Sequence, residues 1–494
     1  MPDRAFIMSP SPRLAVLVLL ASSCHGILAL DKVSLPRGAP LRPALGSAVS
    51  GSRVPRGPVL SAATASALPP SGGASMPSTI ANLAKNIVGS GVLALAAGVG
   101  AFSGARVAIV PALALLFMMC GLSGYTFSSI ARVSAAVGAS SYRDAWSKVF
   151  GQRSAAFPNA AIVFKTFVGC LAYAIILGDS AASMASLAGG TGALAAPNLW
   201  IGLISTCILL PLCLLRDLSS LSVGSIIGTL GTSYTAIFMA IRCLDGSYAA
   251  GGARAALIPA SARPAFSAPV GVLGGLNLKS LVLVSMLATT FLAHYNAPKF
   301  YTELAAPKKG PKLASFNKAV AGGFGLAAVL CGSIMAAGYL TFGAASSGFI
   351  LNNYATRDAL AVVARLGIFS SVTFSYPLLF FGLRDGVLGM LGFNAADDKT
   401  HRIATAVLMG VVNGLACVMK DLGLVTALGG AILGSTIVYI LPALMALRTS
   451  AKNKADGKAP LLGPAETAFN LALLPFGASL ALIGAIMTLK GAAH

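Results

Sequence analysis

The sequence predicts an all-α integral membrane protein that crosses the bilayer about eleven times. Hydrophobic residues make up 56% of the chain and charged residues only 10%, and the mean hydropathy is +0.82. A soluble domain carries about 25% charged residues. The apolar residues also gather in stretches of ~20, which is the length that an α-helix needs to cross the hydrocarbon core. Such a composition cannot cover a water-facing surface, so the chain must lie largely in lipid.

Residues 1–78 are expected to form a targeting leader. Residues 14–21 are a short apolar run behind Arg4 and Arg13, as in a secretory signal peptide. Residues 32–78 are rich in Pro, Ser, Ala and Gly and contain no acid, as in an organellar transit peptide. The combination resembles the bipartite leader of algae with complex plastids and predicts a plastid envelope or another endomembrane. A disordered cytosolic tail behind a chance apolar run, on a plasma membrane protein, is the alternative.

Residues 79–494 form the predicted transmembrane domain. The apolar stretches lie near residues 79–101, 106–130, 157–185, 199–215, 218–241, 280–298, 319–342, 359–383, 403–419, 422–447 and 467–489. If the first span starts in the cytosol, the cytosolic loops carry roughly twice as many Lys and Arg residues as the opposite loops, as the positive-inside rule requires. This count supports eleven spans and places the C-terminus on the side opposite the cytosol.

Several classes of function are disfavoured. The net charge of +21 comes without an aromatic-interleaved basic patch, so cytosolic loops and the leader explain it better than nucleic-acid binding does. The eight cysteines form no CxxC pair, which argues against a disulfide framework or a zinc site. Only one histidine, His294, lies well inside a span, and there is no GxxxxGK[ST] loop. We therefore expect no enzyme.

Two predicted spans contain helix-breaking residues. The first, NLAKNIVGSGVLAL (82–95), has a Gly-Ser-Gly triplet at 89–91, and the sixth, LATTFLAHYNAPKFYTEL (287–304), has His, Asn and Pro within 294–298. Breaks at positions one and six are typical of transporters built from two inverted repeats of five helices. Half-helix N-termini would face an anionic group and unwound carbonyls an ammonium group, which suits an amino acid. Close helix packing is the alternative explanation for the triplet.

These stretches also resemble the amino acid/auxin permease family, including its sodium-coupled neutral amino acid transporters. Residues 82–95 are similar to the first-helix pattern, an Asn-Leu followed by Gly-small-Gly. Residues 287–304 are similar to the sixth-helix pattern, with its His and the closing Tyr-x-Glu-Leu at 301–304. ARLGIFSSVTFSYPLLFFGLRDGV (364–387) is similar to the eighth helix. The likeness covers roughly residues 79–450.

The resemblance implies the leucine-transporter fold of eleven helices, with amino acids moved together with sodium ions or protons and no other cofactor. The substrate residues that it implies are Asn82, Gly89, Ser90, Gly91, His294 and Asn296. The ion-coupling residues that it implies are Asn82, Ser370, Thr373 and His294, with sodium at Asn82 and Thr373.

The coupling ion stays open at this point. Sodium-coupled members commonly have a second Asn where this chain has Lys85, and Asn86 is displaced by one position. A cation that faced the site would repel sodium, which favours proton coupling or exchange. His294 could carry the proton because imidazole titrates near neutral pH. The alternatives are a Lys85 that reaches the membrane surface and a His294 that only shapes the break.

Other charges inside the spans are few. Lys165 and Asp179 share the third span but lie ~21 Å apart along a helix, too far to pair directly. Arg365, in the eighth span, is a candidate partner of Asp179 or Asp358.

The sequence therefore predicts a secondary active transporter of neutral amino acids that works by alternating access, coupled to H⁺ or Na⁺. The expected partners are an amino acid and the lipid bilayer, without nucleic acid, and the protein is expected to be a monomer. An auxin-like or organic-anion permease is the alternative within transport. A channel or a non-transporting amino acid sensor on the same fold is the alternative outside it.

Overall fold

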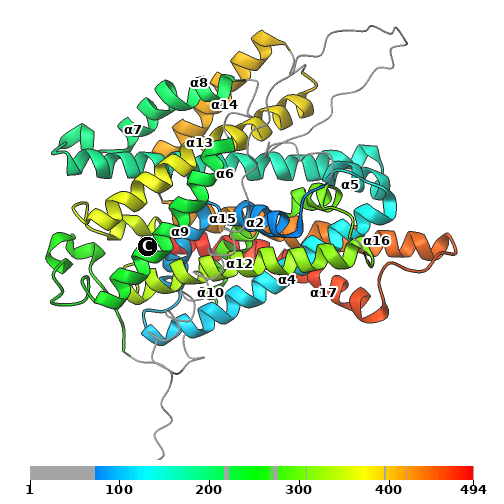
Figure 1. The fold of residues 1–494 in the computed structure, drawn as a ribbon, viewed down its shortest axis with the longest axis horizontal. Helices are drawn as coiled ribbons and strands as arrows, with labels where there is room; N and C mark the ends of the chain where they lie inside the picture. The colour runs from blue at the N-terminus through cyan, green and yellow to red at the C-terminus, as the bar shows by residue number, and fades with distance from the viewer. Residues whose placement is uncertain are drawn as a thin grey trace, which may run out of the picture.

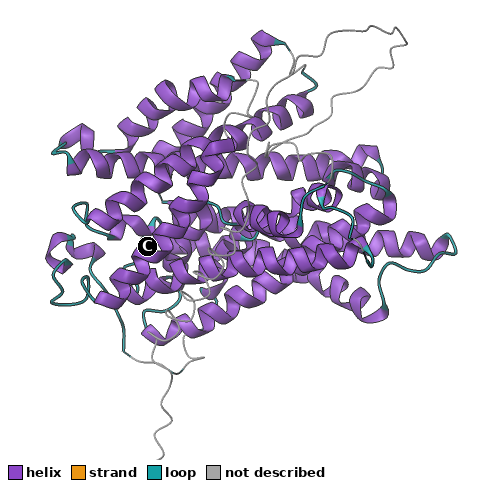
Figure 2. Cartoon of the chain, in the orientation of Figure 1, coloured by secondary structure: helices purple, strands orange, loops and turns teal. Residues whose placement is uncertain are grey.

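The computed structural model describes residues 73–492 apart from 216–221, 269–270, 272–275, 308, 394–396 and 420. Within this part the chain is helical, with two isolated β-bridges and no strand (Figures 1 and 2). Residues 1–72 of the predicted leader lie outside the described residues.

The helices follow the predicted spans in order. They are α2 (Met76–Ile87) with α3 (Leu95–Gly100), α4 (Ile109–Val137), α6 (Ala156–Leu187), α7 (Pro197–Ile204) with α8 (Leu210–Leu214), α9 (Ser222–Asp245), α10 (Ser280–Thr290) with α11 (Ala297–Glu303), α12 (Lys312–Phe342), α13 (Ala359–Leu391), α14 (Asp398–Val418), α15 (Leu422–Gly429) with α16 (Leu441–Ala455), and α17 (Pro464–Ala492). Among the described residues, nine helices are long and apolar enough to cross a membrane, and the α2–α3 pair, bent by 51°, is a tenth. The 24-residue α9 occupies the place of the fifth predicted span.

Burial separates central from peripheral spans. In α10–α11, α12 and α15–α16, 72% of the most apolar window is buried inside the protein, against 28% in α7–α8, α14 and α17. On α14, Ile403, Val407 and Val411 recur every four residues, and each is more than half exposed. An exposed apolar stripe of this kind is stable against lipid and not against water. In Figure 1, α14 lies with α7 and α8 along one edge of the molecule.

Both predicted breaks are present. After α2, Gly89 is extended (φ −107°, ψ −160°) and the chain continues as the short helix η1 (Ser90–Ala94) before α3. After α10, the short helix η9 (His294–Asn296) leads into α11, whose first turn contains Pro298. The breaks interrupt the first and sixth spans, as an arrangement of two five-helix repeats requires.

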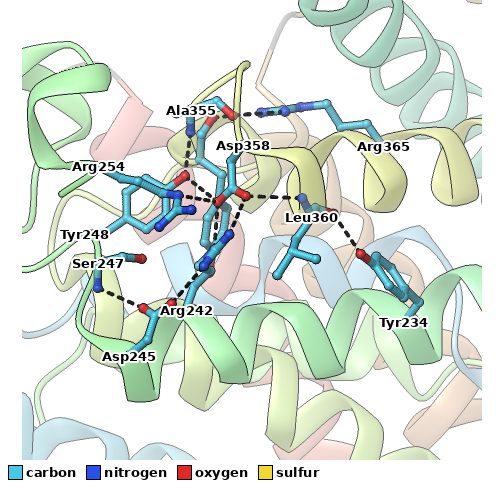
Figure 3. Close-up of polar contacts among 11 residues, drawn as sticks. Tyr234, Arg242, Asp245, Ser247, Tyr248, Arg254, Ala355, Asp358, Leu360 and Arg365 are labelled. Carbon is cyan, nitrogen blue, oxygen red and sulfur yellow. Dashed lines mark hydrogen bonds and ion pairs between the residues drawn. The ribbon is translucent and has the colours of Figure 1, made fainter. Parts of the chain in front are cut away.

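A buried ion pair ties the end of α9 to the start of α13 (Figure 3). The Arg242 guanidinium donates to both carboxylate oxygens of Asp358, over 2.8 Å from Nε and 2.7 Å from Nη2. The Tyr248 hydroxyl donates to Asp358 Oδ2 over 2.9 Å, and Arg254 Nε lies 3.5 Å from the same oxygen. Because Tyr248 and Arg254 belong to the loop after α9, the cluster also holds that loop in place.

The pairing predicted for Arg365 is wrong. Its guanidinium donates to the carbonyl oxygens of Leu351 and Tyr354, over 2.8 and 2.7 Å, and forms no ion pair among the described residues. Asp179 instead accepts a hydrogen bond from Asn352 Nδ2 over 2.9 Å. The carbonyls of the turn before α13 satisfy the buried guanidinium, and the sequence pattern gives no sign of that turn.

Gly430→Ala is expected to destabilise the protein. Gly430 begins η11 (Gly430–Ile440), the π-helical continuation of α15, and a Cβ at this position would overlap the Ser285 carbonyl oxygen of α10. Overpacking costs about 1–3 kcal/mol, and more where backbone must move. We expect the melting temperature in detergent to fall by several degrees. The matched control is Gly414→Ala on α14, where a Cβ would meet nothing within 4 Å. Equal melting temperatures for the two variants would contradict the close packing.

Candidate functional site

The two breaks line a partly open cavity of about 100 Å³. The end of α2 and the first break, α6, the end of α10, α13, α15 and η11 form its wall, so the first, third, sixth, eighth and tenth spans meet there. Typical ligand pockets measure ~300–1,000 Å³, so the cavity is smaller than these and could hold only a small molecule. The polar and backbone lining residues include Asn86, Gly89, Gly91, Lys165, Thr289 and Thr426.

The first break presents backbone to the cavity. Gly89 and Gly91 line it, and Ser90 lies between them, with a side chain outside the described part of the structure. No side chain caps η1, so its first N–H groups lack a helical partner. A Cβ on Gly91 would lie 3.1 Å from Thr290 Oγ1, so glycine lets the first break pack closely against α10.

A hydrogen bond joins the two breaks. Asn296, in η9, donates from Nδ2 to Oδ1 of Asn86, in the last turn of α2, over 3.2 Å. Asn86 lines the cavity, whereas Asn296, a predicted substrate residue, is only 4% exposed and does not line it. On the same side, Thr289 Oγ1 donates to the Thr426 carbonyl over 2.6 Å and ties α10 to α15. Segments 210 residues apart in sequence therefore form one structural unit.

Lys165, on α6, also lines the cavity. Its Nζ donates to the Tyr295 hydroxyl over 3.0 Å and lies 4.8 Å from the centre of the Tyr295 ring. Tyr295 belongs to η9, so this contact joins the third span to the sixth break. Sequence reasoning considered Lys165 only as a partner of Asp179. The sequence did contain a signal for this residue: a lysine inside an apolar span, with no acidic residue three or four positions away to pair with it.

Two predicted substrate residues lie elsewhere. Asn82 is exposed, and its Nδ2 donates to Ser78 Oγ over 3.4 Å, one turn away from the cavity. His294 is fully buried on the side of α4, where its Nε2 lies 2.9 Å from Thr126 Oγ1 and 3.1 Å from the Ser123 carbonyl oxygen. Neither residue lines the cavity. In this conformation, His294 connects the sixth break to the second span.

The predicted ion-coupling residues of α13 also lie off the cavity. Thr373 is buried, and its hydroxyl donates to the Phe369 carbonyl of its own helix over 2.8 Å. Ser370 lies on the same helix, half-buried. α13 reaches the cavity through Leu379 instead. No hydrogen bond among the described residues joins Asn82 to Thr373.

The family model for transmembrane amino acid transporter proteins matches residues 72–489. The chain therefore belongs to the transmembrane amino acid transporter family. It is a multi-pass integral membrane protein, and the resemblance seen at the first, sixth and eighth spans is confirmed.

Curated relatives of this transporter family are distant and match over most of the chain. Putative sodium-coupled neutral amino acid transporter 11 of Homo sapiens is 22% identical over 380 residues, which cover 76% of this chain and 86% of the relative. Vacuolar amino acid transporter 5 of Schizosaccharomyces pombe is 25% identical over 417 residues, or 83% and 91%. Amino acid transporter AVT6E of Arabidopsis thaliana is 21% identical over 398 residues, or 74% of each chain.

Solved structures with a similar arrangement include the inward-facing conformation of Mhp1, with a TM-score of 0.49 and 14% identity over 87% of this chain and 94% of that one. MhsT in complex with L-phenylalanine has a TM-score of 0.46 and 13% identity over 84% and 97%.

Proposed function

We propose that this protein is a secondary active transporter that moves amino acids across a membrane by alternating access. The observation that carries the proposal is the cavity between the two broken spans, which the Asn296–Asn86 hydrogen bond joins. Backbone at Gly91, in the first turn of η1, supplies an N–H group that no side chain caps for the substrate carboxylate. Membership of an amino acid transporter family supports the same substrate. The names of the animal relatives specify neutral amino acids, and we extend that class to this chain.

Gradient-driven uptake tests the proposal. Purified protein in proteoliposomes is expected to accumulate labelled amino acids from a mixed pool when a sodium or pH gradient is imposed, and to stop when the gradient is collapsed. Accumulation of indole-type or other organic anions in place of amino acids would contradict the proposed substrate. Binding without accumulation would assign the protein to sensors.

The coupling ion is proposed to be H⁺ or Na⁺, with no other cofactor. Lys85 is half-buried in α2, with Asn86 directly after it at the cavity wall. A positive charge on the residue next to the cavity wall disfavours a sodium site there, which supports coupling to protons. Thr373 remains the candidate sodium ligand on α13.

If uptake by the parent depends on sodium, Thr373→Ala is expected to raise the half-saturating sodium concentration at least about tenfold. A polar contact to a charged group contributes about 1.5–3 kcal/mol, and about 1.4 kcal/mol corresponds to a tenfold change in affinity. The hydroxyl only bonds back to its own helix, so folding should not suffer. Thr436→Ala is the matched control, because that exposed hydroxyl makes the same type of bond to Ile432. An unchanged sodium dependence would remove Thr373 from the ion site, and a parent that needs no sodium would assign coupling to protons.

We also propose that the protein works as a monomer in a plastid envelope or another endomembrane, with the plasma membrane as the alternative. The basic, acid-free leader supports this location. Imaging of a C-terminal fluorescent fusion, with and without residues 1–78, tests the location. Light scattering of the purified protein tests the monomer.

A further inference from the structure

Lys165 places a fixed positive charge in the wall of the cavity. It is the tenth residue of the 32-residue helix α6, about 14 Å from the start of the helix. A charge at such a depth in a membrane protein is costly and is retained where it has a function. Its surroundings must therefore either neutralise it or leave it for a ligand.

The described residues do not neutralise it. The Nζ of Lys165 contacts the hydroxyl and the ring of Tyr295, and no carboxylate forms an ion pair with it. None of the described residues that line the cavity is acidic. The hydroxyl takes one of the three donors of the ammonium group, so the others can reach a ligand. The cavity therefore carries an uncompensated positive charge.

We propose that Lys165 binds a carboxylate on the substrate side chain, so that the transporter accepts acidic amino acids as well as neutral ones. This inference rests on the proposed function. The charges of the α-carboxylate and α-ammonium groups of an amino acid cancel each other. A second carboxylate, on the side chain, would therefore neutralise the charge of Lys165. Lys165 is half-buried, and pairing such a cation reduces the penalty that an unpaired one carries. Tyr295 is a positioning residue, since its hydroxyl holds the ammonium group at the sixth break.

The test compares uptake of labelled aspartate and glutamate with that of alanine and serine in proteoliposomes. The parent is expected to take up both classes. In Lys165→Gln, kcat/KM for aspartate and glutamate is expected to fall at least tenfold. For alanine and serine, kcat/KM should stay within about threefold of the parent value. Lys165→Arg should retain acidic uptake, and Tyr295→Phe should raise KM for the acidic substrates only. Lys318→Gln, which removes an exposed lysine of α12, is the matched control.

Different results separate this inference from the proposed function. Neutral uptake by a parent that neither transports nor binds acidic amino acids would overturn the inference and leave the proposed function intact. An equal loss of both classes in a folded Lys165→Gln variant would also overturn it. In a third outcome, chloride accelerates the uptake of neutral amino acids by the parent, and acidic amino acids do not compete with that uptake. This result would assign Lys165 to the binding of an inorganic anion and would also overturn the inference. Absence of all amino acid uptake would overturn both proposals. Thermal stabilisation of the parent, but not of Lys165→Gln, by aspartate or glutamate is the expected binding result.

Discussion

Gly89→Val is expected to abolish amino acid uptake and to leave the protein folded. Gly89 lies at the cavity wall in the first break, and its backbone is in an extended conformation that valine adopts readily. A Cβ at this position would meet nothing within 4 Å. The new side chain would therefore occupy open space at the point where the substrate carboxylate must approach backbone N–H groups. We expect at least a hundredfold loss in kcat/KM, measured as initial uptake into proteoliposomes.

The control for this experiment is Gly414→Val on α14. That position also has no neighbour within 4 Å of a Cβ and lies on a peripheral span. Both variants should elute as single peaks and melt within a few degrees of the parent. Gly89→Ala should give an intermediate loss, because its side chain is smaller. Parental uptake kinetics in Gly89→Val would remove the first break from the substrate site.

Asp358→Asn is expected to cause the largest loss of stability of any single change proposed for this chain. The side chain of Asp358 is 0% exposed and that of Arg242 is 10% exposed. Loss of the carboxylate charge leaves Arg254 without this partner and Arg242 with only the half-exposed Asp245, 2.8 Å from its Nη1. Removing one partner of a buried ion pair costs about 3–5 kcal/mol. Thermal unfolding followed in detergent should show a melting temperature well below that of the parent.

An exposed ion pair provides the comparison. Lys148 and Asp144 pair over 3.0 Å with side chains 41% and 35% exposed. Exposed pairs contribute about 0–1 kcal/mol, so Asp144→Asn should melt close to the parent. If Asp144→Asn and Asp358→Asn had equal effects, the Arg242–Asp358 pair would not be the anchor between α9 and α13.

The pH dependence of the Asp358 effect follows from its surroundings. Burial alone would raise the pKa of the Asp358 carboxyl, but hydrogen bonds from Arg242 and Tyr248 lower that pKa below its usual 3.8. A carboxyl with a lowered pKa stabilises the fold fully above its unfolded-state pKa, and loses that contribution as the pH falls through the folded-state pKa. The difference between parent and Asp358→Asn should therefore stay constant from about pH 8 to 5 and shrink only below about pH 4. A difference that disappeared near pH 6 would contradict this assignment.

The order of the spans and the position of both breaks could be predicted from the sequence. Long apolar stretches and clusters of Gly, Asn and Pro can be read directly from the sequence. In a bilayer the apolar stretches must form membrane-spanning helices, and the clusters interrupt those helices. Gly89 and Gly91 lie at the cavity, and their contact with the substrate stays a prediction.

Which side chains line the cavity depends on how deep each helix sits and how it is rotated about its axis. The local sequence pattern does not give either quantity. Asn82 and Asn86 lie one turn apart on the same side of α2, but only Asn86 is next to the break and lines the cavity. Lys165 became a candidate only when the structure brought α6 against η9. His294 belongs to the break but contacts α4 instead of the cavity. These contacts are made between distant segments, and no spacing rule within one helix predicts them.

Counterflow measures the central claim most directly, because it detects one cavity that opens to each side in turn and needs no ion gradient. Proteoliposomes are loaded with a saturating mixture of unlabelled amino acids and diluted into buffer with a trace of the labelled mixture. An alternating-access transporter of amino acids is predicted to accumulate the label transiently above its equilibrium level, with Gly89→Val giving no such overshoot. Label that only equilibrates would identify a channel, and label that does not enter would identify a sensor. Either result would contradict transport by alternating access.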